Sequence, residues 1–160
     1  MADIVKLHIS NEDTKSTPAP NFMTGERDSA IRDLLKDSHF RPQGDEKAPY
    51  AVNLSIQDNR LVFMLKNAND EELPSLVLSL NPYRRIMRDY FLMIQSYEDL
   101  RAAANQAKLE AVDMGRRGLH NEAAELLQTR LENKIAMDLN TARRIFTLIC
   151  YLQTESKIWR

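Results

Sequence analysis

Three arginine pairs and one histidine are the residues of this sequence whose chemistry could form a functional site. The pairs are Arg84–Arg85, Arg116–Arg117 and Arg143–Arg144, and the histidine is His120. A guanidinium group binds carboxylate and phosphate oxygens through two parallel hydrogen bonds, and a histidine can accept a proton near neutral pH. These residue types therefore point to anion recognition or to acid–base catalysis.

The pairs Arg84–Arg85 and Arg143–Arg144 fall where the sequence predicts the first turn of a helix. The helix dipole disfavours an exposed, unpaired cation there by about 0.3–1 kcal/mol. An internal acid such as Asp89, Asp138 or Glu132 would offset this cost, and we favour such structural ion pairing. A bound anion would offset it too, because helix N-termini and guanidinium groups both attract anions. Each pair gives one side chain to any one helix face, since neighbours point about 100° apart.

The remaining arginine pair and His120 lie beside a predicted turn between two helices. Arg116–Arg117 precedes Gly118, a residue typical of helix C-caps, so these cations would complement the dipole of a last helical turn and are weaker anion-binding candidates. His120 with Glu122 as its acid would make a small hydrolase or transferase site. We prefer the simpler interpretation, in which His120 or Asn121 caps the following helix.

Nothing in the sequence predicts a metal or a cofactor. His8 and His39 are scattered, and no cysteine or histidine cluster has the spacing of metal ligands. Cys150 lies in an apolar run, which is typical of a buried thiol. The acids that we expect on solvated faces are Glu26, Asp28, Asp33 and Glu71–Glu72.

A predicted α+β fold positions these residues. It is a small antiparallel β-meander, with an N-terminal strand and helix, packed against a C-terminal bundle of about four helices. The predicted strands cover 3–10, 50–56, 60–66 and 76–80. The predicted helices cover 24–35, 82–104, 105–117, 121–131 and 140–152, with Asn81 and Asn140 as N-caps.

Length and composition indicate a single domain, residues 1–160, with a strand-rich half (1–80) and a helical half (81–160). Apolar residues make up 43% of the chain, and the formal net charge is −1. The near-zero charge argues against broad nucleic-acid binding. The chain shows no secretory signal and no apolar run long enough for a membrane helix, so we expect a cytoplasmic protein without a membrane partner.

Three segments carry a resemblance to a known family: Asn81–Phe91, Ala111–Glu122 and Thr141–Cys150. Together with Glu26–Leu35 and Pro49–Leu54, they resemble the signature segments of an uncharacterised family of short alphaproteobacterial proteins, the UPF0262 type. The resemblance covers nearly the whole chain except the loop 11–22. It implies a bacterial cytoplasmic protein that forms one unit, and it implies no activity.

Three functions remain open, in this order. The first is a non-enzymatic interaction or regulatory module, in which a protein partner or a second copy in a homodimer would contact the apolar tail at Ile158–Trp159. The second is binding of a phosphate-bearing ligand or nucleic acid by Arg84–Arg85 and Arg143–Arg144, which requires both helix starts to meet on one surface. The third is the His120 hydrolase or transferase, which requires a pocket and a positioned base. Because the two non-enzymatic functions rank first, we expect a protein that is not an enzyme.

Overall fold

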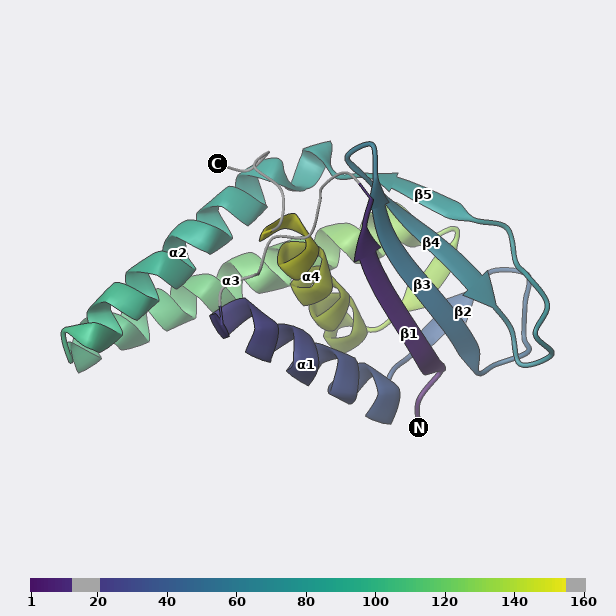
Figure 1. The fold of residues 1–160 in the computed structure, drawn as a ribbon, viewed down its shortest axis with the longest axis horizontal. Helices are drawn as coiled ribbons and strands as arrows, with labels where there is room; N and C mark the ends of the chain where they lie inside the picture. The colour runs from purple at the N-terminus through teal and green to yellow at the C-terminus, as the bar shows by residue number, and fades with distance from the viewer. Residues whose placement is uncertain (13–20, 155–160) are drawn as a thin grey trace.

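The computed structural model describes residues 1–12 and 21–154 and confirms a mixed α+β fold (Figure 1). Its strands are β1 (Ile4–Asn11), β2 (Phe40–Pro42), β3 (Tyr50–Gln57), β4 (Arg60–Lys66), β5 (Leu76–Ser79) and β6 (Ile135–Met137). Its helices are α1 (Asn21–Lys36), α2 (Arg84–Ala102), α3 (Gln106–Leu131) and α4 (Leu139–Thr154), with a 3-10 turn at Asn81–Tyr83. Every predicted strand is present, and β2 and β6 are additions.

The main sheet has the strand order β1–β3–β4–β5, and its β3–β4–β5 part is the predicted antiparallel meander. A tight turn joins β3 to β4, with Asp58 and Asn59 at positive φ angles of 52° and 57°, as the tolerance of these residues for that region predicts. β1 instead pairs with β3 in parallel. A parallel pair needs a crossover connection, and the connection that contains α1 supplies it.

A second sheet joins two short segments that the sequence pattern does not reveal. β2 and β6 pair antiparallel, with Phe40 opposite Met137. Strands of three residues are too short for alternation to stand out. The pairing ties the chain after α1 to the connection between α3 and α4, and the His39 N–H donates to the Thr141 hydroxyl at 3.0 Å. The first turn of α4 is therefore held beside the end of α1.

The helices α2 and α3 form a long antiparallel hairpin that extends away from the sheet (Figure 1). α3 is one continuous helix, so the predicted break at Gly118 was wrong. A glycine inside a helix costs only about 1 kcal/mol relative to alanine, and the packing of α3 against α2 and α4 outweighs that cost. Two predicted helices are thereby merged into one.

The N-caps of α2 and α4 differ from the predicted ones. Asn81 is the first residue of the 3-10 turn that precedes α2, and its side-chain oxygen accepts a bond from the Asn59 amide at 2.9 Å rather than capping the helix. In α4 the cap is Asp138, whose carboxylate accepts from the Thr141 N–H at 2.8 Å, and not Asn140. The positive end of α4 is thus already satisfied by an acid of the chain.

One apolar cluster connects the inner face of the sheet with the helices. The aromatic side chains buried in it include those of Phe40, Tyr50, Phe63, Tyr83, Tyr90 and Phe146. The buried residues of α2 in this core lie in its first two turns (Ile86, Met87, Tyr90 and Phe91), and Ile94 in the next turn packs against it. The outer part of the α2–α3 hairpin is half-exposed. Within residues 1–12 and 21–154, no helix is both long and apolar enough to cross a membrane.

Candidate functional site

The pair Arg84–Arg85 lies at the start of α2, and one of its members is held by acids of the chain. Arg85 forms ion pairs with Asp89, at 3.3 Å, and with Glu122 of α3, at 2.7 Å. Asp89 is one of the internal partners that the sequence predicts. Arg84 is exposed and has no ion-pair partner in the described part of the chain. The charge of Arg85 therefore serves to join α2 to α3.

The pair Arg116–Arg117 lies in the middle of α3, so its predicted place in a last helical turn was wrong. Both guanidinium groups bind the same carboxylate, that of Asp113, at 2.8 Å and 2.9 Å. The hydrogen bond from Arg116 is the largest influence that holds the pKa of Asp113 below its ordinary value. An acid one turn away binds both members of the pair and offsets part of their charge, and the helix dipole is not involved.

His120 is fixed by hydrogen bonds at both ring nitrogens. The Nε of Arg143 donates to Nδ1 at 3.2 Å, so Nδ1 is an acceptor and the ring proton lies on Nε2. Nε2 is 2.8 Å from the Thr147 hydroxyl oxygen and donates to it, while that hydroxyl donates to the Arg143 carbonyl at 3.2 Å. The three side chains form a closed set of bonds that joins α3 to α4.

The surroundings of His120 keep its imidazole neutral. Burial, followed by the positive charges of Arg143 and Arg116, lowers its pKa to about 4. The ring stacks on Tyr90 with centroids 5.7 Å apart and meets Phe146 edge-on at 5.4 Å. At neutral pH this histidine is therefore an uncharged acceptor for Arg143.

A pocket of about 260 Å³ opens between α1 and α4 beside His120. The two helices run antiparallel, and hydrogen bonds hold both ends of their contact: Arg27 to the Tyr151 hydroxyl at 2.7 Å, and Arg144 to the Asp37 carbonyl at 3.0 Å. We call this hollow the α1–α4 pocket. Its lining comes from Glu26, Ser29, Ala30 and Asp33 of α1, His120 of α3, and Asn140, Arg143, Arg144 and Thr147 of α4.

The α1–α4 pocket contains charges of both signs that do not pair with each other. Among the described residues, Arg143 forms no ion pair, and neither does Glu26 or Asp33. Their positions in the sequence predict a solvated face for both acids, and the structure places them at the pocket. Their separation of seven residues, which puts them on one helix face two turns apart, was the signal that could have found them.

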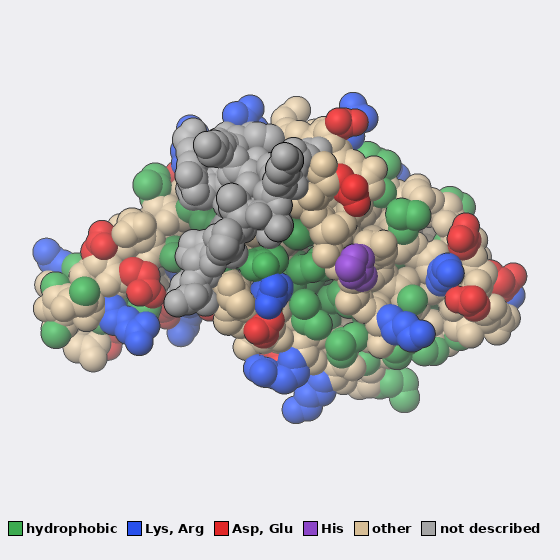
Figure 2. All heavy atoms as spheres, viewed as in Figure 1, with side chains coloured by type: hydrophobic (Ala, Val, Ile, Leu, Met, Phe, Trp, Pro, Cys, Tyr) green, Lys and Arg blue, Asp and Glu red, His purple; other side chains and the backbone are tan. Residues whose placement is uncertain are grey.

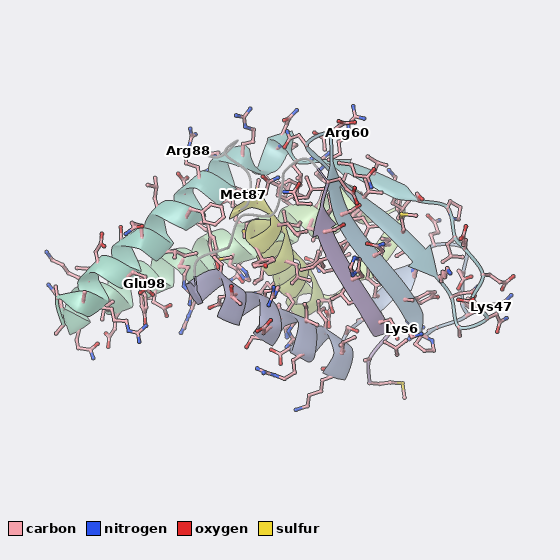
Figure 3. The ribbon with its side chains drawn as sticks, viewed as in Figure 1. Lys6, Lys47, Arg60, Met87, Arg88 and Glu98 are labelled. Atoms are coloured by element: carbon pink, nitrogen blue, oxygen red, sulfur yellow. The ribbon has the colours of Figure 1, made fainter. Side chains whose placement is uncertain are left out.

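The two helix-start arginine pairs do not share a surface. α2 begins beside the end of β5, whereas α4 begins beside the end of α1, on the opposite side of the body (Figure 1). Arg88, one turn after Arg84, points away from the body (Figure 3). On the face seen in Figure 2, basic and acidic side chains are interspersed and form no continuous basic stripe. Joint recognition of one anion by both pairs therefore lacks the required geometry.

The structure separates the residues of the hydrolase or transferase hypothesis. Glu122 binds Arg85 and not His120, whose ring nitrogens bind Arg143 and Thr147. Cys150 is buried, and burial raises the pKa of its thiol well above the ordinary value. Over the described residues, no group of histidine, cysteine, aspartate or glutamate side chains has the arrangement of a metal site. The tail residues Ile158–Trp159 lie outside the described residues.

Comparisons with known proteins place the chain in a family. The model of the "Uncharacterised protein family (UPF0262)" matches residues 2–155. The UPF0262 proteins of Brucella canis and of Brucella suis are each 43% identical to the chain over 152 residues, which cover 94% of this chain and 93% of the relative. No solved structure matches the protein. The matched span and the identity show that this chain belongs to the UPF0262 family, as its signature segments suggest.

Proposed function

We propose that this protein is a non-enzymatic binding module whose α1–α4 pocket holds the carboxylate or phosphoryl group of a small ligand. The observation that carries the proposal is the state of the Arg143 guanidinium. It lines the pocket, its Nε is bonded to His120, and its Nη groups have no hydrogen-bond partner in the described part of the chain. A positioned guanidinium with free Nη groups matches the paired oxygens of a carboxylate or phosphate.

His120 supports this role because it is neutral. An uncharged imidazole accepts a bond from Arg143 and restricts its position without neutralising its charge. An acid in the same place would pair with the guanidinium and compete with a ligand. Arg144 adds a second positive charge at the same pocket while it binds the carbonyl of Asp37. A binding site gains affinity when its groups are ordered before the ligand arrives.

Two properties of His120 favour binding over catalysis. Both ring nitrogens are engaged within the protein, so neither faces a substrate without first breaking a bond. A pKa of about 4 also makes the imidazole a weak base at neutral pH. Cys150, the one cysteine of the sequence, is buried and reduced, and we place the module in the cytoplasm.

Thermal unfolding in the presence of millimolar phosphate or butyrate, at constant ionic strength, tests the proposal. A ligand that binds only the folded state raises the melting temperature in a concentration-dependent manner. We expect this rise in the wild type and not in Arg143→Lys, which keeps the charge and loses the planar fork. Arg84→Gln is the matched control and should behave as the wild type. An equal rise in Arg143→Lys would reject the site, because excluded salts stabilise every protein similarly.

A second candidate function is self-association through the α2–α3 hairpin. Leu92 and Met114 are exposed by 62% and 72%, respectively, and lie at the same level of the hairpin, where Met93 contacts Gly115. Two large apolar side chains left in water favour an interface with a second copy of the chain. Sedimentation velocity should then show a dimer, and Leu92→Gln with Met114→Gln should return it to 18.5 kDa. A wild-type monomer at high concentration would exclude this candidate.

A further inference from the structure

We infer that the ligand of the α1–α4 pocket is a small zwitterion, which carries a protonated amine in addition to the oxyanion. The inference rests on the proposed function and names the ligand class of the same site. It comes from the acids of the pocket, Glu26 and Asp33, which a site for a simple anion would not contain.

Glu26 and Asp33 stand on one wall of the pocket and the arginines on the other. The two acids lie seven residues apart on α1, and therefore on one helix face. Arg143 and Arg144 come from α4. Because neither acid forms an ion pair with either arginine, the opposite charges are too far apart to neutralise each other. A ligand that carries both charges can reach both walls.

The charge balance favours a zwitterion over the simpler ligands. Two carboxylates and two guanidinium groups give the lining a formal charge of zero, since His120 is neutral. A simple anion would be attracted by Arg143 but repelled by Glu26 and Asp33. A simple cation would be attracted by the two acids but repelled by the arginine. An amine facing the acids and an oxyanion facing the arginines place each charge of the ligand beside groups of opposite sign, with no net charge brought into the pocket.

The volume of the pocket limits the size of this ligand. Pockets that enclose drug-sized molecules measure about 300–1,000 Å³, whereas this one measures about 260 Å³. Ser29 and Thr147 add hydroxyl groups to its wall, and their hydroxyl oxygens already accept bonds from Arg32 and His120. The shape and chemistry fit a short amino acid or an amino-alkyl phosphate better than a nucleotide or a peptide.

Chemical-shift titration of the isotopically labelled protein with matched probes tests the inference. The zwitterions are glycine, β-alanine and γ-aminobutyrate; the matched anions are acetate, propionate and butyrate; the matched cations are methylamine, ethylamine and propylamine. A charge-assisted bond contributes about 1.5–3 kcal/mol, so at least one zwitterion should bind about tenfold to a hundredfold more tightly than its matched anion. Asp33→Asn or Glu26→Gln should remove this gain and leave binding of the anion, and Arg143→Lys should weaken both.

The outcomes separate the inference from the proposed function. Equal affinity for zwitterion and matched anion, with loss of both in Arg143→Lys, would overturn the inference and support the proposed function. Binding of the amines alone, or of no probe, would overturn both. Circular dichroism of each variant, together with unchanged shifts around Asn67 at the far end of the sheet, confirms that the variants are folded and keeps a negative result interpretable.

Discussion

Two polar clusters of this protein differ in whether their charges are satisfied by the protein itself. The first, which we call the Asn67 cluster, consists of Asp45, Lys47, Tyr50, Asn67 and Glu71 at the end of the main sheet. The second is the α1–α4 pocket. Both contain acidic and basic side chains close to each other. Only in the first do the acidic side chains form ion pairs or hydrogen bonds with the basic ones.

In the Asn67 cluster every member has a partner. The Asn67 amide donates to Asp45 at 2.9 Å and to Glu71 at 3.1 Å, and its oxygen accepts from the N–H groups of Asn69 and Glu71 at 3.0 Å and 3.1 Å. Lys47 binds Glu71 at 2.9 Å. Asn67 is only 6% exposed, and a buried side-chain amide does not destabilise the fold when all its hydrogen bonds are made. This cluster is structural.

The comparison gives a criterion for a binding site in a protein of this kind. A cluster that exists to hold a loop completes its own hydrogen bonds, because unpaired groups would cost stability. A cluster that exists to hold a ligand leaves partners for it. The charges of the α1–α4 pocket, which form no ion pair with the described residues and of which Arg144 binds a backbone carbonyl, match the second description, and the measurements below test the distinction.

Asn67→Ala should cause the largest loss, about 3–4 kcal/mol of unfolding free energy. The change removes four hydrogen bonds from a buried position and leaves the N–H groups of Asn69 and Glu71 without an acceptor. Chemical denaturation measures the effect, with Asn133→Ala, at an exposed turn between α3 and β6, as the matched control. A loss below about 1 kcal/mol would show that the Asn67 cluster does not stabilise the fold.

Lowering the pH should destabilise the two clusters in separate ranges. The pKa of His120 falls from 6.5 to about 4 on folding, so between these values the unfolded chain binds more protons and stability declines by about 2–3 kcal/mol as the pH falls. The Asn67 cluster responds at lower pH. Its hydrogen bonds hold the pKa of Asp45 and Glu71 below their ordinary values, so their contribution is present above about pH 4.5 and is lost as the pH falls through the folded values.

The variant His120→Gln separates these ranges. It should flatten the stability profile between pH 6.5 and about 4 and leave the decline at lower pH unchanged. Denaturation midpoints across the pH series measure this, with His8→Gln, an exposed histidine on β1, as the control. A profile that stays the same in His120→Gln would show that His120 does not titrate as its burial requires.

Arg143→Gln should cost about 1 kcal/mol in the absence of ligand, because among the described residues its side chain loses one hydrogen bond, to His120. The same change removes a positive charge beside His120, so the pKa of that histidine should rise toward its ordinary value. Histidine-detected NMR titration measures the second effect. An unchanged His120 titration would place the guanidinium away from the ring.

Asp33→Asn should cause the smallest change, within about 0.5 kcal/mol, since the acid forms no ion pair with the described residues. Asp45→Asn is the matched substitution in the Asn67 cluster and should cost clearly more, because Asp45 accepts bonds from Asn67, Tyr50 and the Lys47 N–H. Thermal unfolding of both variants under the same conditions measures the two losses. Equal losses would erase the distinction between the two clusters.

Local sequence patterns were enough to predict most of the elements. Alternation from Val52 to Ile56, with Asp58 and Asn59 in the turn before 60–66, predicts the hairpin, because strand period and turn chemistry act over a few residues. The break predicted at Gly118 failed for the opposite reason. Packing of α3 against α2 and α4 decides whether the helix continues, and one glycine carries too little energy to stop it.

Some residues of the candidate site could be predicted from the sequence, but their contacts could not. Residue type and position in the sequence are enough to single out His120 and Arg143, because a histidine beside a predicted turn and an arginine pair at a helix start can bind ligands in any fold. Only the tertiary structure decided that they contact each other, that Glu122 belongs to Arg85, and that the acids of α1 face the arginines of α4. These relations join residues far apart in the chain, and they depend on the β2–β6 pairing and the antiparallel α1–α4 contact, which have no periodic signal.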